Sequence, residues 1–367
     1  MRIIQIIDVR WYNACADFAV KQAQGLILAG HDVLLMANPG SPLIQKALDV
    51  KIDVSDELDF AGINKIIKGP KNLRKIARDF KADIIFAHRG ESHLIAALAK
   101  RGEKFKVARF RGDIRPPKSG PLSRYLNTKL TDGIAVSTEK LRIGYESQFK
   151  LKGIPTRVIY PGVDKGLYAP KTSTDVLKKK IGLKPNDPVI GLVGRFSPVK
   201  GHRYFIEAAK LISLKYPRVQ FVIAGGDAQI TEAELKFSVA TLKIPNVHFT
   251  GLVDNIAEVI STFDIGVVSS IGSEMICRVL LEYYSAGLPV VATAINQISE
   301  IVLQSNGGVL IEPANSVAMG QAIIDILANS DKSRELSRNG KSWVEHRSLL
   351  DLGRESAEFL NEVLRAQ

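Results

Sequence analysis

Two glutamates, Glu274 and Glu282, stand eight positions apart in the stretch SSIGSEMICRVLLEYYSAGLPVVAT. This pattern predicts a loop over Ser269–Ile276, a helix over Cys277–Ala286 and the start of an apolar strand over Val290–Ala292. The loop and the helix start offer free N–H groups between the two carboxylates, which suits an anion or a hydroxyl-rich ligand. The alternative is structural, because Glu near a helix start also pairs with the helix dipole.

A second candidate site is the loop Gly194–Gly201, GRFSPVKG, which follows the apolar strand pattern Val189–Val193. Arg195 can bind phosphate oxygens through its forked guanidinium, and Lys200 adds a point charge. The loop lacks the Gly-Lys-Ser/Thr ending of the phosphate loop of nucleotidases, and no GxGxxG follows the first strand. The spacing therefore argues against a nicotinamide site, and a basic turn without a ligand is the structural alternative.

The composition indicates a globular protein. The chain has 367 residues, of which 46% are hydrophobic and 24% charged, so two domains are expected. No apolar run approaches the roughly 18 residues of a membrane span, and MRIIQIIDVR is typical of a first strand rather than a signal peptide. Cys15 and Cys277 are isolated. They argue against a disulfide framework or a zinc site and favour a reducing cytosol, so we expect a cytoplasmic protein.

The net charge of +12 is unevenly distributed. Residues 1–167 hold 29 Lys and Arg against 17 Asp and Glu, whereas residues 168–367 hold 21 of each. A basic half predicts an anionic partner, such as nucleic acid, an anionic membrane surface or an acidic substrate, although a merely lysine-rich surface is the alternative. The segment Lys65–Lys81 carries seven of the cations. Within it, Leu73–Phe80 predicts an amphipathic helix, either on anionic lipid or packed on a sheet.

Short apolar strands alternate with helical patterns along the chain, which predicts parallel sheets with helices on both faces. The predicted strands of the first half are Arg2–Val9, a strand from His31, Asp83–Ala87, Lys106–Phe110, Gly133–Val136 and Arg157–Tyr160. Those of the second half are Val189–Val193, Val219–Ala224, Val247–Phe249, Ile265–Val268, Val290–Ala292 and Gly308–Ile311. A turn-rich stretch from Tyr160 and an exposed stretch, Lys171–Asp187, separate two similar α/β halves. Ligands of such sheets bind at the carboxyl ends of the strands.

Taken together, the two cations and the two glutamates match a nucleotide-sugar, and here the chain resembles a known family. It is similar to the retaining glycosyltransferases of family 4 (glycosyl transferases group 1), which have the GT-B fold. The landmarks span nearly the whole chain: GHDV from Gly30, DIIFAH from Asp83, YPGVD from Tyr160, VGRFSPVKGH from Val193, FVIAGG from Phe221, VHFTGLV from Val247, and the glutamate stretch itself.

The resemblance implies two Rossmann-like, doubly wound domains that face each other across a cleft. Residues 1–167 would bind the acceptor, joined by a crossover helix within 348–367, and residues 168–347 would bind the nucleotide-sugar, with UDP, GDP or another base. Arg195 and Lys200 would hold the diphosphate, Glu274 the donor sugar and Glu282 the ribose. Neighbouring positions complete the implied donor site: Gly194, Ile276, Cys277 and Arg278. No metal and no further cofactor is implied.

The chain departs from the family pattern at three places. The usual glycine pair after the first strand is replaced by a bulkier segment that includes Asn13. The usual His after Lys106–Phe110 is missing, so Arg111, Asp113 or His88 is the candidate for its role near the acceptor. Ile276-Cys277 replaces a Phe-Gly pair, and packing rather than nucleophilic chemistry is expected of the thiol.

The arginines and lysines near Pro116-Pro117 predict an anionic acceptor; they are Arg109, Arg111, Arg115, Lys118 and Arg124. A lipopolysaccharide core or a polyprenyl- or phosphatidyl-linked glycan would fit. We therefore expect a metal-independent, retaining transferase of class EC 2.4 in cell-envelope glycan synthesis, peripheral on the inner face of the membrane. Two alternatives stay open: a UDP-sugar epimerase of the same fold, and a non-catalytic nucleic-acid-binding protein. The latter leaves the site residues unexplained and lacks an aromatic stacking platform.

Overall fold

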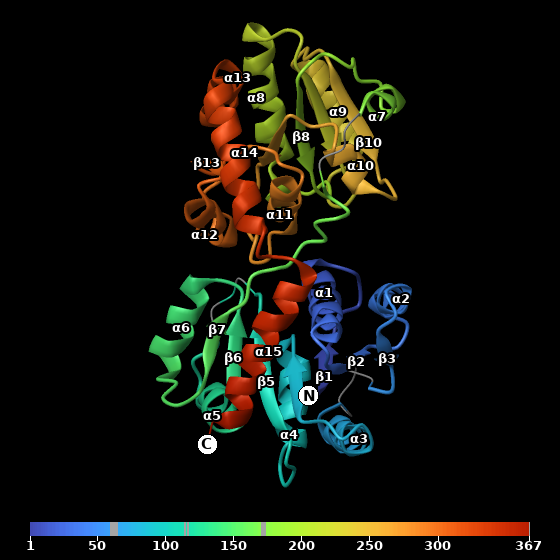
Figure 1. Cartoon of the computed structure of the whole chain (residues 1–367), viewed down its shortest axis with the longest axis vertical. Coiled ribbons are helices and arrows are strands. Elements are labelled where there is room, and N and C mark those ends of the chain that lie inside the picture. Colours follow the sequence, from blue (N-terminus) through green and yellow to red (C-terminus); the bar gives the residue numbers. More distant parts are fainter. Residues whose placement is uncertain (59–64, 114, 116, 170–173, 367) are drawn as a thin grey trace. The chain divides into compact units, whose positions relative to one another are not determined.

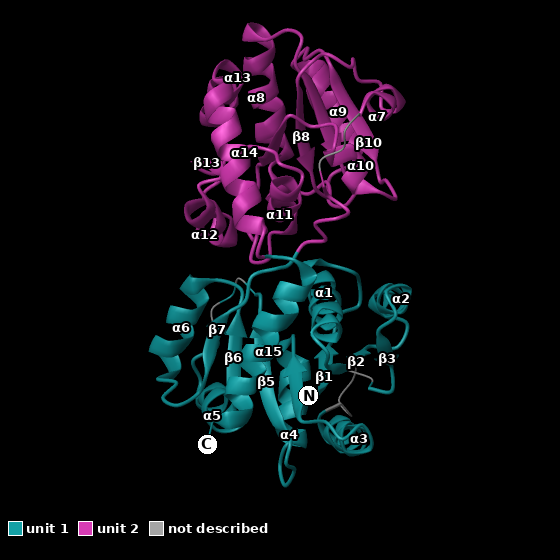
Figure 2. Ribbon diagram, in the orientation of Figure 1, with its two compact units in different colours: residues 1–162, 347–367 teal, residues 163–346 magenta. Residues whose placement is uncertain are grey.

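The computed structural model describes residues 1–58, 65–113, 115, 117–169 and 174–366. The chain forms two compact units, which are shown in different colours in Figure 2. Unit 1 comprises Met1–Gly162 and Arg347–Gln367, and unit 2 comprises Val163–His346. The predicted boundaries after residue 167 and before residue 348 fall close to these divisions.

Unit 1 is built on a seven-stranded parallel sheet with the order β3-β2-β1-β4-β5-β6-β7 (Figure 1). Its strands are β1 (Arg2–Ile7), β2 (Asp32–Ala37), β3 (Asp53–Ser55), β4 (Ile84–Ala87), β5 (Lys106–Arg111), β6 (Gly133–Val136) and β7 (Thr156–Val158). Its helices are α1 (Ala14–Leu28), α2 (Pro42–Asp49), α3 (Lys65–Asp79), α4 (Gly90–Ala99), α5 (Pro121–Lys129), α6 (Glu139–Phe149) and α15 (Leu349–Arg365).

Unit 2 repeats this architecture with a six-stranded parallel sheet of order β10-β9-β8-β11-β12-β13. Its strands are β8 (Val189–Val193), β9 (Gln220–Ala224), β10 (Val247–Gly251), β11 (Ile265–Val268), β12 (Val290–Thr293) and β13 (Gly308–Ile311). Its helices are α7 (Asp175–Lys180), α8 (His202–Lys215), α9 (Glu232–Thr241), α10 (Ile256–Ile260), α11 (Arg278–Ser285), α12 (Asn296–Ser305), α13 (Ser316–Ala328) and α14 (Ser330–Val344), with a 3₁₀ turn at Pro198–Lys200.

Helices cover both faces of each sheet, which confirms the predicted doubly wound, Rossmann-like fold. In unit 1, side chains of β1, β4 and β5 pack against α3 and α4 on one face. On the other face, Phe110 of β5 stacks on Phe18 of α1, and Phe86 of β4 contacts Phe359 of α15. Because both faces are buried, the strands read as continuous apolar runs rather than as an alternation.

Several short or polar elements are absent from the sequence prediction. They are α2, β3, α5, α6 and α7. Each of them is only 3 to 11 residues long, so the sequence offers few turns over which a hydrophobic period can be recognised. The segment Lys171–Asp187, expected to be an exposed linker, contains α7, while its residues 171–173 lie outside the described part of the chain. The basic helix begins at Lys65 rather than at Leu73, since Gly69 and Pro70 are both accommodated inside α3.

The C-terminal helix α15 returns to unit 1 and packs beside α1, as predicted (Figure 1). The two helices meet backbone to backbone at Gly25 and Gly353. A Cβ on Gly353 would lie 1.9 Å from Gly25 O, and a Cβ on Gly25 would lie 2.2 Å from Leu349 O. Contact at this distance is possible only without side chains, so the two glycines set the spacing of the helix pair.

Substitution of Gly353 by Ala should therefore destabilise unit 1, because one helix must move away from the other. We expect a loss of about 1–3 kcal/mol in the free energy of unfolding, measured by urea denaturation. Gly144→Ala is the matched control, because Gly144 lies inside helix α6 with nothing within 4 Å of its Cβ position. That control should be neutral or stabilising by up to about 1 kcal/mol. Equal effects of the two changes would contradict the close helix contact.

A buried hydrogen-bond network joins β1, β4, α1 and α15. Gln5 Nε2 donates to Gln22 Oε1 at 2.9 Å and lies 3.3 Å from His88 Nε2. Gln22 Nε2 donates to Ser356 Oγ at 2.8 Å, across 334 positions of sequence. His88 is 3% exposed and is enclosed by the rings of Phe18, Phe86 and Phe110. Burial, together with the charge of Arg109, lowers the pKa of His88 to about 3, so this imidazole is neutral at physiological pH.

The stability of unit 1 should fall as the pH drops below about 6.5. In that range the unfolded chain protonates His88 and the folded chain does not, so the stability is complete above pH 6.5 and is lost toward pH 3. Between pH 6.5 and pH 5 this one group contributes a loss of about 2 kcal/mol. Urea unfolding of the His88→Gln variant should show a smaller loss over the same interval. An identical pH dependence in the two proteins would contradict the buried neutral state.

Candidate functional site

Two loops at the carboxyl edge of the unit 2 sheet are joined through their backbones. They follow the neighbouring strands β8 and β11. Gly201 has φ +67°, and a Cβ there would lie 2.0 Å from Ser269 O, so only glycine fits. Ser269 Oγ donates to Lys200 O at 2.7 Å, and Ile271 N donates to Val199 O at 2.9 Å. These contacts fix the position of Lys200 relative to the second loop.

Lys200 and Glu274 form an ion pair between Nζ and Oε1. The same carboxylate oxygen accepts a hydrogen bond from Ser270 Oγ at 2.7 Å. Glu274 is only 6% exposed, whereas 24% of the Lys200 side chain is exposed. Both residues are candidates from separate stretches of the sequence, and the structure brings them together. An ammonium, a carboxylate and a hydroxyl in one place can bind phosphate oxygens and sugar hydroxyls.

The backbone beneath this cluster is held in an unfavourable conformation. Ser273 and Glu274 have φ values of +64° and +52°, in the left-handed region that side chains other than glycine rarely adopt. Such positions persist only where the surroundings enforce them, and they concentrate at functional sites.

Three residues that were not predicted from the sequence hold this backbone in its conformation. They lie at the end of β12 and at the start of α12. Thr293 Oγ1 donates to Ser270 O at 2.5 Å, and Asn296 Nδ2 donates to Ser273 O. Gln297 is fully buried; its N–H donates to Glu274 O at 3.2 Å, and its Oε1 accepts from Cys277 N at 2.7 Å. These residues could have been predicted from their position, since they are polar and follow directly after a buried strand. Polar residues in that position meet the neighbouring loops at the carboxyl edge of the sheet.

Glu282 lies in the second turn of α11 and is 7% exposed. The next residue ties this helix to β8, since Tyr283 OH accepts from Val193 N at 2.9 Å. Gly194 and Arg195 follow Val193 directly, and Arg195 is exposed. Helix α11 and the basic loop are therefore held to the same strand end.

The residues between the two glutamates are mostly buried. Met275, Ile276 and Cys277 are at most 6% exposed, and Arg278 begins α11, one residue later than predicted. Burial raises the pKa of the Cys277 thiol, so it is not a thiolate at neutral pH. Its backbone N–H is bound by Gln297, and the side chain packs, as expected from the sequence.

The candidate acceptor residues in unit 1 lie at different depths. Asn13 caps α1, with Oδ1 accepting from Cys15 N at 3.0 Å and Ala16 N at 3.1 Å. Arg111 donates to Tyr145 OH at 3.2 Å, and Asp113 Oδ1 accepts from Arg115 N at 3.1 Å. His88 belongs to the buried network described above, which favours a structural role. The acceptor roles of these residues stay predictions.

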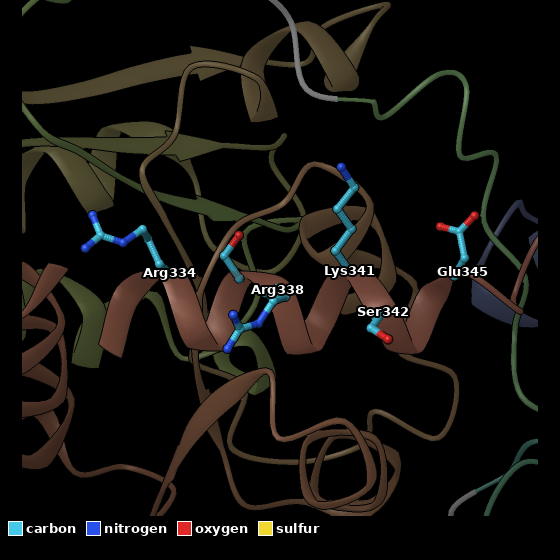
Figure 3. A pocket seen from close by; sticks show the side chains of 6 residues that line it. Arg334, Arg338, Lys341, Ser342 and Glu345 are labelled. Carbon is cyan, nitrogen blue, oxygen red and sulfur yellow. The ribbon is translucent and has the colours of Figure 1, made fainter. Parts of the chain in front are cut away.

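A surface hollow of about 620 Å³ lies along α14 and contains none of the predicted site residues. Figure 3 shows Arg334 and Lys341 pointing to one side of the helix and Arg338 and Ser342 to the other. Because a single helix supplies its lining, the hollow lacks the convergence of several loops that ligand sites have, and the site at the sheet edge is the better candidate.

The described residues contain neither a cluster of metal-binding side chains nor a membrane-spanning helix. No three His, Cys, Asp or Glu side chains among them lie together as a possible metal site. The helices they form are all too short or too polar to cross a lipid bilayer.

Comparison with known proteins gives family matches in both units. The profile "Glycosyltransferase Family 4" matches residues 18–166, and the profile "Glycosyl transferases group 1" matches residues 173–343. The chain is 28% identical over 204 residues to YtcC of Bacillus subtilis, which is 52% of this chain and 50% of that protein. It is 32% identical over 171 residues to the Escherichia coli UDP-Gal:alpha-D-GlcNAc-diphosphoundecaprenol alpha-1,3-galactosyltransferase, 46% of this chain and 43% of that enzyme. The chain thus spans half or less of the length of these curated relatives.

A solved structure matches over the whole fold. Anabaena Alr3699/HepE, crystallised with UDP and glucose, superposes with a TM-score of 0.81 at 20% identity, covering 98% of this chain and 99% of that one. This likeness concerns the fold, which agrees with the predicted GT-B architecture. On the two family matches, the chain belongs to the family 4 glycosyltransferases, the glycosyl transferases group 1.

Proposed function

We propose that this protein transfers a sugar from a nucleotide-diphosphate sugar to a glycan, lipid-linked or lipopolysaccharide-core acceptor, with retention of the anomeric configuration. The observation that carries the proposal is the Lys200–Glu274 pair, held where the loops after β8 and β11 meet. A cation and a carboxylate at one strand edge match the diphosphate and the sugar of such a donor. UDP and GDP are the first bases to test.

The basic loop provides the leaving-group site. Cleavage of the bond between the anomeric carbon and the phosphate oxygen places negative charge on the departing nucleoside diphosphate. Lys200 and Arg195 stabilise that charge, and because they are positioned before the reaction they need little reorganisation. In other enzymes a divalent metal supplies this stabilisation, and here we assign it to the two side chains.

The two glutamates bind the uncharged parts of the donor. Glu274 accepts hydrogen bonds from hydroxyls of the donor sugar, in place of the one that Ser270 now donates. Glu282, on α11, accepts from the ribose hydroxyls. The N–H of Cys277 is taken by Gln297, so we assign the remaining N–H groups between Met275 and Arg278, at the start of the helix, to the sugar or the phosphates.

Retention follows from a front-face reaction. The bond from the anomeric carbon to the phosphate oxygen breaks, the acceptor oxygen forms its bond on the same face, and the acceptor proton passes to the leaving phosphate oxygen. A double displacement would need a carboxylate nucleophile beside the anomeric carbon. We assign Glu274 to the hydroxyls of the donor sugar, where Ser270 now donates to it, and not to the role of nucleophile; this assignment favours the front-face route.

The acceptor is assigned to unit 1, on the basis of its charge. Unit 1 holds 31 Lys and Arg against 20 Asp and Glu, a difference of +11, whereas unit 2 holds 19 against 18, a difference of +1. Helix α3 packs through Leu73 and Ala77 and exposes Ile66 and Ile67 (49% and 74%) beside the lysines Lys68, Lys71 and Lys75. A basic helix with exposed apolar side chains suits an anionic membrane surface, where a lipid-linked acceptor would reside.

The test uses a transfer assay with UDP- and GDP-sugars, followed by ¹H NMR of the product. We expect the anomeric configuration of the donor to be kept and a Lys200→Ala variant to lose roughly 10²–10³ in turnover. Arg203→Ala is the control, since it removes an 80% exposed cation three residues further along. Free sugar-nucleotide isomer without an acceptor would indicate an epimerase, and full turnover by Lys200→Ala would refute the assigned role.

Replacement of Gln297 by Leu should weaken donor binding without unfolding the protein. The change leaves the buried N–H of Cys277 unpaired, at a cost of about 1–3 kcal/mol, which releases the loop that carries Glu274. We expect about tenfold weaker UDP binding by isothermal titration calorimetry. Gln321→Leu, at an exposed position on α13, is the matched control and should bind UDP normally. Unchanged affinity in both variants would mean that α12 does not position the donor loop.

A further inference from the structure

A cluster of arginines lies at the carboxyl edge of the unit 1 sheet. Strands β1, β4 and β5 are neighbours in the order β1-β4-β5. Asp8 follows β1, Arg89 stands between β4 and α4, and Arg109 and Arg111 belong to β5. Arg109 is paired in register with Ala87, two positions before Arg89. The arginines therefore come from adjacent strands and gather at the edge where parallel sheets bind ligands.

Arg109 is almost completely buried. Only 5% of the residue is exposed, and its Nη1 has no hydrogen-bond partner among the described residues. Side chains alternate along β5, so Arg109 and Arg111 lie on the face opposite Phe110, which stacks on α1. Burial lowers the pKa of Arg109 to about 10, and the charges of Arg111 and Arg89 also lower it, against the opposing influence of Tyr145 and Asp8.

The negative charge nearby offsets the charge of this guanidinium only in part, through Asp8. No ion pair joins Arg109 to a carboxylate among the described residues. Asp8 uses Oδ1 to accept from Ser92 N at 3.1 Å, in the first turn of α4, and burial raises the pKa of Asp8. Asp113 Oδ1 accepts from Arg115 N. A buried, unpaired charge is costly, so its presence calls for a compensating partner.

Arg111 completes the arrangement. It donates to Tyr145 OH at 3.2 Å and lies 5.6 Å from the centre of that ring, which orients its guanidinium. Its Nε is buried and, like Arg109 Nη1, has no hydrogen-bond partner among the described residues. Arg111 also donates through Nη2 to Arg115 O, and the Ser92 N–H in the first turn of α4 is taken by Asp8. Among the described residues, the groups left without a partner are therefore Arg109 Nη1 and Arg111 Nε, and guanidinium N–H groups of this kind match a tetrahedral oxyanion.

We propose that Arg109 and Arg111, with Arg89 at the start of α4, form a binding site for a phosphate group. This deepens the proposed function and rests on it in one respect: the phosphate belongs to the acceptor. The phosphate binds to the guanidinium N–H groups and neutralises the excess charge, and so it positions the acceptor in unit 1. Its source is either a soluble sugar phosphate or the phosphate of a lipid headgroup, which present the same chemistry to the arginines.

The test measures phosphate binding to the full chain. Isothermal titration calorimetry and ³¹P NMR line broadening, with inorganic phosphate and with a hexose 6-phosphate, report on the wild type without any substitution. We expect at least tenfold weaker binding in Arg109→Met, which keeps the side-chain length and removes the charge, and also in Arg111→Lys, which keeps the charge and loses the fork. Arg101→Met, an exposed arginine of the same unit, is the control and should bind as the wild type does.

Two further measurements separate the possible outcomes. Flotation measures binding of the protein to phosphatidylcholine vesicles, with and without phosphatidate. A lipid source of the phosphate is identified if Arg109→Met abolishes the binding that depends on phosphatidate and leaves the rest unchanged. UDP affinity, measured in the same variants, reports on unit 2 and tests the proposed function independently. The phosphate site is overturned if the wild type binds neither phosphate nor hexose 6-phosphate, or if Arg109→Met and Arg111→Lys bind both as tightly as the wild type.

Discussion

The close approach of two backbones at Gly201 is the constraint on which the unit 2 site depends. Any side chain there would collide with Ser269 O, and a Cβ on Gly225 would likewise lie 2.0 Å from Gly194 O. These glycines allow the loops after β8, β9 and β11 to meet at one edge of the sheet. Lys200 and Glu274, 74 positions apart, become an ion pair only because of that contact. The chemistry of the site therefore follows from the packing of its backbone.

The electrostatics of the site are organised before a ligand arrives. Glu274 is nearly buried and would be an uncompensated charge without Lys200, and loss of one partner of such a pair is costly. In the proposed reaction, a diphosphate that binds Lys200 would relieve this pairing and leave the carboxylate available to sugar hydroxyls. The left-handed backbone at Ser273 and Glu274 is held by α12, which fixes the position of the carboxylate. Preorganised charges of this kind stabilise a transition state with little rearrangement.

The two units share one sheet topology and use its carboxyl edge differently. In unit 2 the cation at the edge already has a carboxylate partner, whereas no carboxylate in the described part of unit 1 pairs with the buried Arg109. The charge totals of the units follow the same division, +1 against +11. A paired site suits a ligand that carries both charge and hydroxyls, and an unpaired one suits an anion. This difference gives a physical reason for assigning the two substrates to different units.

Sequence patterns alone were sufficient for the alternating strands and helices, the two-unit division and the membership of Arg195, Lys200, Glu274 and Glu282 in one unit. These features depend on local periodicity and on turn residues, which neighbouring positions reveal. Only the tertiary structure decided that Gln297 and Asn296 hold the loop that carries Glu274, that His88 is enclosed by aromatic rings, and that Gly25 meets Gly353. Such contacts join residues far apart in the chain, and burial of a single side chain such as that of Arg109 depends on what the rest of the fold places around it.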